Sequence, residues 1–187
     1  FEKTAINRWF LHHIKELVES AKDFVLEKES ILKAKQMGFS DKQLAVILQI
    51  TEEEVFAFRK KESILPTYKV VDTCSGEFEA KTPYYYATYE VEDELREATK
   101  ERILIVGSGP NRIGQGIEFD YCCVHASYAC QEMGFESVMI NSNPETVSTD
   151  FDTSDHLFFE PLSLEDVRHL YESIKPKGVI IQFGGAN

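Results

Sequence analysis

The sequence has no apolar run long enough to cross a membrane as a helix, and no signal-peptide pattern near its first residue. It also has no Cys-x-x-Cys pair of the kind that binds zinc, and the adjacent Cys122 and Cys123 are poorly placed to bridge each other. We therefore expect reduced thiols, a cytoplasmic protein, no metal site within the chain and no membrane partner.

Basic residues are scarce as well. Lys and Arg number 20 against 32 Asp and Glu, a net charge of -12. A nucleic-acid surface needs a clustered basic face, so we expect no nucleic-acid partner. Apolar residues make up 43% of the chain, enough for a packed core in one medium domain or two small ones. The chain begins Phe1-Glu2-Lys3, without a Met, and we expect it to be a segment of a longer protein.

Residues 1–67 have the pattern of a small helical bundle. Apolar side chains recur at helical spacing over residues 6–21 and form one stripe. A second helix is expected over residues 30–37 and ends at Gly38, because glycine accepts the left-handed backbone found at helix ends. We predict that the apolar faces of these helices pack together.

Two capping boxes, Ser40 with Gln43 and Thr51 with Glu54, predict two further short helices. Two helices joined by a short turn resemble a helix-turn-helix, so a DNA-binding regulator is one alternative. Its recognition helix would begin with the three glutamates at 52–54, which repel phosphates. A packed bundle is therefore the favoured interpretation.

Residues 68–100 show no helical period. Valine and aromatic side chains are mixed irregularly with Gly76, Pro83 and polar residues, and residues 90–100 are highly charged. We predict an extended connector that lies against another surface and uses its aromatic side chains as anchors.

From residue 101 to residue 187, short apolar runs alternate with helical patterns. Strands are predicted at residues 103–106, 137–140, 157–159 and 178–183, and helices at 116–133 and 163–173. Such alternation is typical of a parallel sheet with helices on its faces. The predicted fold class is therefore α + α/β, a helical bundle followed by a partial Rossmann-like parallel sheet.

A glycine-rich turn joins the first of these strands to the helix behind it. Glycines let the backbone approach a ligand closely, and the start of the helix offers unpaired N–H groups. An anion such as phosphate, carboxylate or carbamate suits this environment. The anion-binding candidates in the turn are Gly109, Asn111, Arg112, Gly114 and Gly116.

A second polar loop, residues 141–150, follows the next strand. Loops at the carboxyl ends of parallel strands meet at one crevice, so we expect this loop, with Asn143 and Glu145, to converge there with the glycine turn and Gly184-Gly185. Glu118 and Asp120 are expected to face the same space. For Glu118, capping of the helix start is an equal alternative. A nicotinamide site is disfavoured, because Arg112 replaces the third fingerprint glycine and asparagines stand where a ribose-binding acid is needed.

Several motifs are long enough to resemble one family. GPNRIGQGIEFDYCCVHA at residues 109–126 and NPETVSTD at 143–150 resemble the start of the second half of the carbamoyl phosphate synthetase large subunit. Upstream, Arg8-Trp9-Phe10, Gly38-Phe39-Ser40-Asp41 and Asp72-Thr73-Cys74 resemble that family's oligomerisation domain and connector. The motifs occur in the family's order over nearly the whole chain.

The resemblance implies three parts: a helical oligomerisation domain at 1–67, a connector at 68–100 and a pre-ATP-grasp domain at 101–187. It implies an ATP-dependent ligase that makes carbamoyl phosphate from bicarbonate, ammonia and ATP for arginine and pyrimidine synthesis. A glutamine amidotransferase small subunit would supply the ammonia, and ATP-grasp domains outside this chain would bind ATP and Mg²⁺ or Mn²⁺.

By the same resemblance, this chain alone carries no catalytic residue and no cofactor, and we expect it to be inactive by itself. Arg112, Gly116, Glu118 and Glu145 fall on motif positions beside the family's carbamate tunnel. The helical half would supply contacts for self-association. The alternative is a stand-alone module that self-associates through its helices and binds an anion at the glycine turn.

Overall fold

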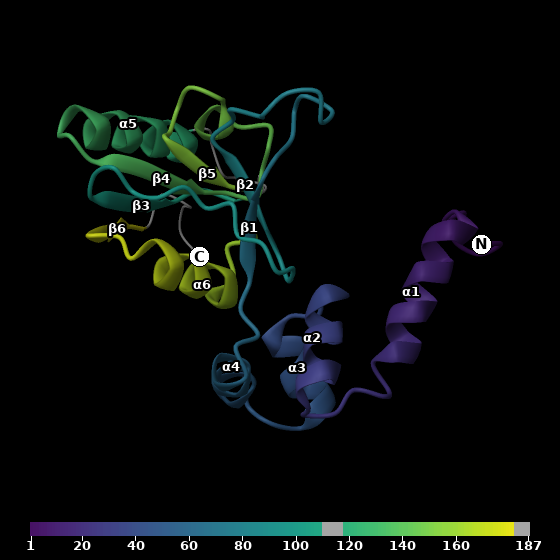
Figure 1. Cartoon of the computed structure of the whole chain (residues 1–187). Coiled ribbons are helices and arrows are strands. Elements are labelled where there is room, and N and C mark those ends of the chain that lie inside the picture. The colour runs from purple at the N-terminus through teal and green to yellow at the C-terminus, as the bar shows by residue number, and fades with distance from the viewer. Residues whose placement is uncertain (110–117, 182–187) are drawn as a thin grey trace. The chain divides into compact units, whose positions relative to one another are not determined.

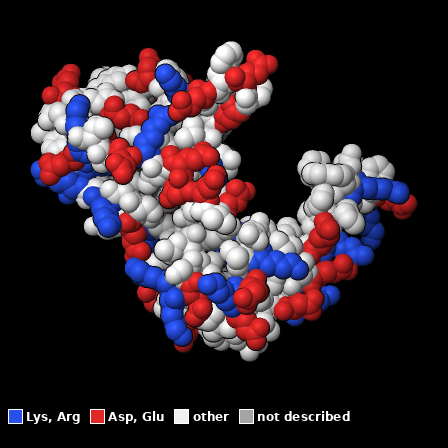
Figure 2. All heavy atoms as spheres, viewed as in Figure 1, with Lys and Arg blue, Asp and Glu red and all other residues white. Residues whose placement is uncertain are grey.

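The computed structural model describes residues 1–109 and 118–181 of the chain (Figure 1). The chain divides into two compact units, Phe1–Leu65 and Pro66–Asn187. No helix within the described ranges is long and apolar enough to span a membrane. On the face drawn in Figure 2, Lys and Arg are interspersed with Asp and Glu.

The first unit is helical. Its helices are α1 (Arg8–Ser20), α2 (Lys28–Gln36), α3 (Asp41–Leu48) and α4 (Glu52–Lys61). Both predicted capping boxes are present at the starts of α3 and α4, with Ser40 and Thr51 as the N-caps. Gly38 follows α2 with φ +89, the left-handed backbone that ends a helix without strain in glycine.

Helices α2, α3 and α4 supply the core of this unit. Its buried side chains are Phe24, Ile31, Ala34, Leu44, Ala45, Val55, Phe56 and Ile64. A charged pair is buried with them: Arg59 Nη2 lies 2.5 Å from Asp41 Oδ2, and neither side chain is more than 1% exposed. Lys35 Nζ lies 3.4 Å from the other oxygen of Asp41. Removal of one partner from a buried pair leaves an uncompensated charge, so this cluster constrains how α3 and α4 pack.

Helix α1 differs from the predicted bundle. The predicted helix and its apolar stripe are present, but α1 buries no residue. Trp9 is 62% exposed, Phe10 56% and Ile14 52%. Periodicity identifies an apolar face but not the surface that covers it, which is why the sequence alone could not place α1 in or outside the core.

The second unit is built around one sheet. Its strands are β1 (Thr67–Val70), β2 (Tyr84–Thr88), β3 (Arg102–Val106), β4 (Glu136–Ile140), β5 (His156–Phe158) and β6 (Gly178–Ile180). The strand order is β1-β2-β5-β4-β3-β6. Helix α5 (Glu118–Glu132) lies on one face and α6 (Leu164–Ile174) on the other (Figure 1).

A hydrophobic cluster fills each face of this sheet. Leu170 and Ile174 of α6 belong to one cluster, and Cys123 and Cys130 of α5 belong to the other. All five residues of β4 are buried, as expected of a central parallel strand covered on both sides.

The sheet corrects the predicted fold class in one respect, because within the described residues it has six strands and is mixed, not purely parallel. Strand β1 pairs antiparallel with β2, and β2 pairs in parallel with β5. Both extra strands come from the segment predicted as a connector. Each is only four or five residues long, and their pairing is not local, so periodicity could not reveal them. The aromatic side chains do pack: the ring of Tyr85 stacks on Phe158 at 5.0 Å.

The amino ends of the central strands are held together by a buried ionic cluster. Arg102 Nε donates to Glu136 Oε2 at 2.9 Å, directly across the β3–β4 register. Thr99 Oγ1 donates to the other oxygen of Glu136 at 2.6 Å. This cluster fixes the register at one edge of the sheet, and the candidate site lies at the opposite edge.

Candidate functional site

The carboxyl ends of β3 and β4 bring two polar segments together. Val106 and Ile140 are paired across the two strands, and the chain leaves the sheet just after each of them. The glycine turn begins at Gly107, and the polar loop of residues 141–149 begins one residue after Ile140. The two segments from which the predicted crevice would be built therefore start side by side.

Close packing leaves room only for glycine at position 107. A Cβ atom at this position would lie 2.8 Å from the carbonyl oxygen of Ile140 and 2.9 Å from Cγ of Asn141. The Gly107 N–H also donates to that same carbonyl at 2.8 Å. The turn thus starts with the two backbones in direct contact, which only glycine allows.

Asn141 joins the turn to the polar loop. Its side chain is fully buried, and its Oδ1 accepts from the Gly109 N–H at 3.1 Å and from the Asn143 N–H at 3.3 Å. Its Nδ2 donates to Ser148 Oγ at 3.2 Å and lies 3.4 Å from Thr146 Oγ1. One amide group therefore contacts both the start of the glycine turn and the polar loop.

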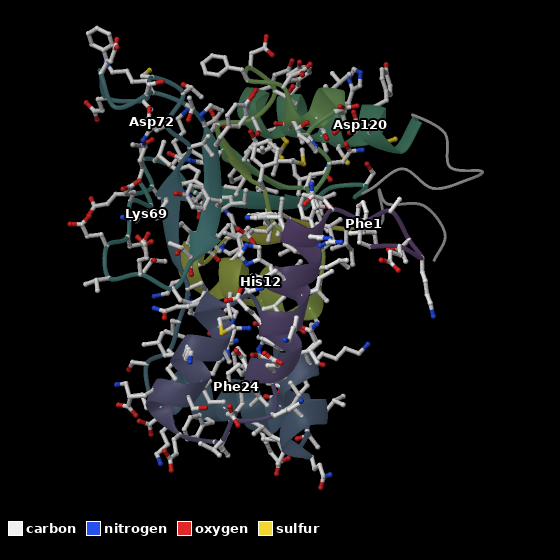
Figure 3. The ribbon with its side chains drawn as sticks, turned by 90° about the vertical axis from the view of Figure 1, so that its right-hand side faces the viewer. Phe1, His12, Phe24, Lys69, Asp72 and Asp120 are labelled. Carbon is white, nitrogen blue, oxygen red and sulfur yellow. The ribbon has the colours of Figure 1, made fainter. Side chains whose placement is uncertain are left out.

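The start of α5 is tied to the same loop. Asp120, in the first turn of α5 (Figure 3), is only 8% exposed, and its Oδ2 accepts from the Ser148 N–H at 3.0 Å. Among the described residues, its other oxygen has no hydrogen-bond partner. Asp120 thus holds the helix that follows the glycine turn against the polar loop.

The polar loop presents its acidic residue outward. Asn143 is half-buried, and its Oδ1 accepts from the Glu145 N–H at 3.0 Å. The side chain of Glu145 is exposed. Glu145 therefore extends into solvent from a backbone that Asn143 fixes.

Cys123 packs against the sheet from α5 and is fully buried. Burial raises the pKa of its thiol to about 12, and the charge of Asp120 adds to the effect. A nucleophilic cysteine needs the thiolate, which this environment disfavours.

Of the predicted site residues, Gly109 and Asn143 are brought together by the side chain of Asn141. Glu145 lies on the same loop. Glu118 is the first residue of α5, and the orientation of its side chain stays a prediction. Asn111, Arg112, Gly114, Gly116, Gly184 and Gly185 lie outside the described residues, so their place in the site also stays a prediction.

The sequence analysis did not predict that Asn141 hydrogen-bonds to both the glycine turn and the polar loop. It used this residue only as an argument against a dinucleotide site. A usable signal exists in the sequence. An amide directly after one strand, opposite a Gly-x-Gly that follows the neighbouring strand, has the donor and the acceptor needed to bind two loops.

Comparison with family models covers both units. Residues 99–187 match the carbamoyl phosphate synthase preATP-grasp domain. Residues 1–63 match the carbamoyl-phosphate synthetase large chain, oligomerisation domain. The two matches follow each other in the chain and leave only residues 64–98 between them.

Curated relatives are similar in sequence over almost the whole length of this chain. The carbamoyl phosphate synthase large chain of Archaeoglobus fulgidus is 53% identical over 99% of this chain, and that of Thermotoga neapolitana is 56% identical over 98%. The arginine-specific, chloroplastic large chain of Arabidopsis thaliana is 52% identical over 99%. The chain spans only 18%, 17% and 16% of the lengths of these relatives.

Proposed function

Because the chain belongs to the family of carbamoyl phosphate synthase large chains, we propose that it works as one part of such a large chain. The whole protein would make carbamoyl phosphate from bicarbonate, ATP and ammonia, for arginine and pyrimidine synthesis. ATP and Mg²⁺ or Mn²⁺ would bind in domains beyond this segment, and a glutamine amidotransferase small subunit would release the ammonia from glutamine. The reaction would take place in the cytoplasm.

In this proposal the α/β unit forms part of the wall along which carbamate travels. The convergence of the glycine turn and the 141–149 loop at one sheet edge supports that role most directly. Backbone N–H groups and Arg112 would attract an anion, while Glu145 would keep it from binding too tightly. The unit would guide an intermediate without reacting with it.

The helical unit would supply contacts for assembly. The exposed apolar stripe of α1 supports this role, since Trp9, Phe10 and Ile14 are each more than half exposed. Such a stripe is unfavourable in water and marks a surface that a partner covers. We propose self-association of the helical domain through this stripe.

A chimera tests the main proposal. In the Thermotoga neapolitana large chain, this chain replaces the segment with which it aligns, and carbamoyl phosphate formation from bicarbonate, ammonia and ATP is measured. We expect activity within a few-fold of the parent, and none from the 187-residue chain alone. A folded chimera that hydrolyses ATP at the parent's rate but forms no carbamoyl phosphate would contradict the proposal.

One substitution in that chimera tests the passage. Gly116→Phe should abolish overall synthesis, because a large side chain would fill the passage wall. Met133→Phe is the matched control: Met133 is 74% exposed at the other end of the α5 segment, where extra volume is accommodated by solvent. Equal synthesis by the two variants would rule out a passage at Gly116.

Sedimentation of the 187-residue chain tests the assembly role. Phe10→Glu puts a charge into the apolar stripe and should weaken self-association by roughly tenfold or more, as expected from loss of a large buried aromatic. Lys15→Ala, on the exposed Lys15–Glu19 pair of the same helix, should leave association unchanged. A wild-type chain that stays monomeric at all concentrations would exclude this stripe as a self-association surface.

A further inference from the structure

We propose that residues 92–95 form a strap that covers the open edge of the sheet at β1, and that the strap prevents this edge from pairing with β1 of a second copy of the chain. The strap lies in the charged segment that the sequence predicted as a connector. Its role rests on its contacts with β1 and does not depend on carbamoyl phosphate synthesis.

Strand β1 lies at one end of the strand order, so no described strand covers its outer side. The Val71 N–H, directly after β1, donates to the Tyr84 carbonyl of β2 at 2.9 Å. Residues alternate in an antiparallel pair, so Tyr68 and Val70 direct their backbone groups away from β2. Backbone groups exposed along a sheet edge are a template for pairing with another chain.

The strap occupies these edge groups. The Glu94 N–H donates to the Tyr68 carbonyl at 2.8 Å, as a neighbouring strand would. Asp93 Oδ1 accepts from the Tyr68 N–H at 3.2 Å, and Glu94 Oε2 accepts from the Val70 N–H at 2.8 Å. Two carboxylates therefore stand where a neighbouring strand would place its carbonyl oxygens.

Other contacts hold the strap in place. Lys69, labelled in Figure 3, is buried, and its Nζ lies 3.1 Å from Glu94 Oε1 and 3.5 Å from Glu92 Oε2. The Val70 N–H and the Lys69 ammonium hold the pKa of the Glu94 carboxyl below its usual value, which keeps the acceptor ionised. Leu95 packs against the hydrophobic cluster on the α6 face of the sheet. The strap is thus fixed by charge, by hydrogen bonds and by apolar contact.

The covered edge is complementary to itself, which identifies a second copy as the partner that the strap excludes. In a hydrogen-bonded antiparallel pair, two opposite residues exchange both of their backbone bonds. Tyr68 presents both its N–H and its carbonyl at the edge, so two copies related by a two-fold axis could place Tyr68 opposite Tyr68. In that register the Val70 N–H faces the Pro66 carbonyl of the other copy. The strap blocks this pairing because it uses the same groups.

Two double variants of the 187-residue chain test the strap. Asp93→Ala with Glu94→Ala removes both side-chain acceptors. Asp93→Asn with Glu94→Gln removes the same two charges but keeps a carbonyl acceptor at each position, so it is the matched control. Both are built on Phe10→Glu, so that any association through α1 is weakened equally.

Sedimentation equilibrium measures the association of these variants. The alanine variant should form a dimer with a dissociation constant at least about tenfold lower than that of the Asn/Gln variant, because only the alanine variant leaves the edge uncovered. Since the two have the same net charge, reduced repulsion between copies cannot produce such a difference. Equal association of the two variants overturns the proposal.

Hydrogen exchange locates the contact. In dilute solution, the Tyr68 and Val70 amides of the alanine variant should exchange roughly tenfold faster than in wild type, because their acceptors are gone. At concentrations where the variant forms a dimer, both amides should become protected again. Slow exchange in dilute solution, or a dimer that leaves these amides unprotected, overturns the proposal.

Glu94→Ala alone is the milder variant, and it is used if far-UV circular dichroism shows that the double variant does not fold. It removes the acceptor of the Val70 N–H and leaves that of the Tyr68 N–H. Exchange should therefore become faster at Val70 and change less at Tyr68. Unchanged exchange at Val70 overturns the strap.

Discussion

Replacement of Gly107 by alanine is the most demanding test of how the site is packed. The added methyl group would lie 2.8 Å from the Ile140 carbonyl oxygen and 2.9 Å from Cγ of Asn141. Neither neighbour can yield easily, since one is the backbone of a fully buried strand and the other is a fully buried amide. The substitution must therefore push β3 and β4 apart at their carboxyl ends.

The expected loss in the free energy of unfolding is the sum of three contributions. Overpacking in a dense region costs about 1–3 kcal/mol, and weakening the Gly107 N–H bond to Ile140 adds about 0.5–1.5 kcal/mol. The smaller conformational freedom of alanine in the unfolded chain offsets about 0.4–1 kcal/mol. We expect a net loss of about 2–3 kcal/mol in the free energy of unfolding. In urea this corresponds to a midpoint about 1 M lower, since m is about 2 kcal/mol/M for a domain of this size.

Gly178→Ala is the control for this measurement. Gly178 also lies at a strand of the same sheet, but its added Cβ would meet only Cδ1 of Ile103, at 3.6 Å, which is an ordinary contact. Its free energy of unfolding, from urea unfolding followed by far-UV circular dichroism, should differ from that of wild type by no more than about 0.5 kcal/mol. Equal midpoints for Gly107→Ala and Gly178→Ala would refute the close contact between the turn and β4.

Three further substitutions test the buried charges. Burial alone would raise the pKa of the Glu136 carboxyl, but hydrogen bonds from Thr99 and Arg102 outweigh burial and lower the pKa from 4.5 to about 2. The ionised carboxylate therefore stabilises the fold above pH 4.5, and this stabilisation is lost as the pH falls toward 2. The melting temperature of Glu136→Gln should not show this loss at acid pH. Burial raises the pKa of Glu160 from 4.5 to about 7, so the stability that its protonated form contributes is lost as the pH rises from 4.5 through 7. Glu160→Gln should therefore have a higher melting temperature than wild type at about pH 8 and a similar one at about pH 4. A melting temperature below that of wild type at about pH 8 would contradict the raised pKa. Asp41→Ala removes the carboxylate from the buried Asp41–Arg59 pair and should destabilise the helical unit by about 3–5 kcal/mol in urea unfolding. A loss below about 1 kcal/mol would contradict a buried pair.

Features determined by neighbouring residues could be predicted from the sequence. The capping boxes at Ser40 and Thr51 depend on groups three residues apart, and both are present. The helix predicted at 163–173 is present as α6, with Ser163 as its N-cap, whose hydroxyl accepts from the Asp166 N–H. The four parallel strands from residue 102 onward were also predictable, because each is a short apolar run next to a helix.

Features that depend on distant partners could not be predicted. Strands β1 and β2 pair with each other and with β5 across long stretches of chain, and Tyr85 becomes a buried residue only through that pairing. The exposure of α1 likewise depends on what else is present, which a hydrophobic stripe does not record. In the site, the sequence indicated which two segments meet, but not that the amide of Asn141 connects them.

The size of the protein in its source cells tests the central claim most directly. An antibody raised against this chain would be used on a denatured whole-cell lysate. Membership of a large chain predicts a single band at roughly five times 21.4 kDa or more, since the chain spans 18% of a relative such as that of Archaeoglobus fulgidus. A single band near 21.4 kDa would contradict that claim and favour a free-standing module that self-associates and binds an anion.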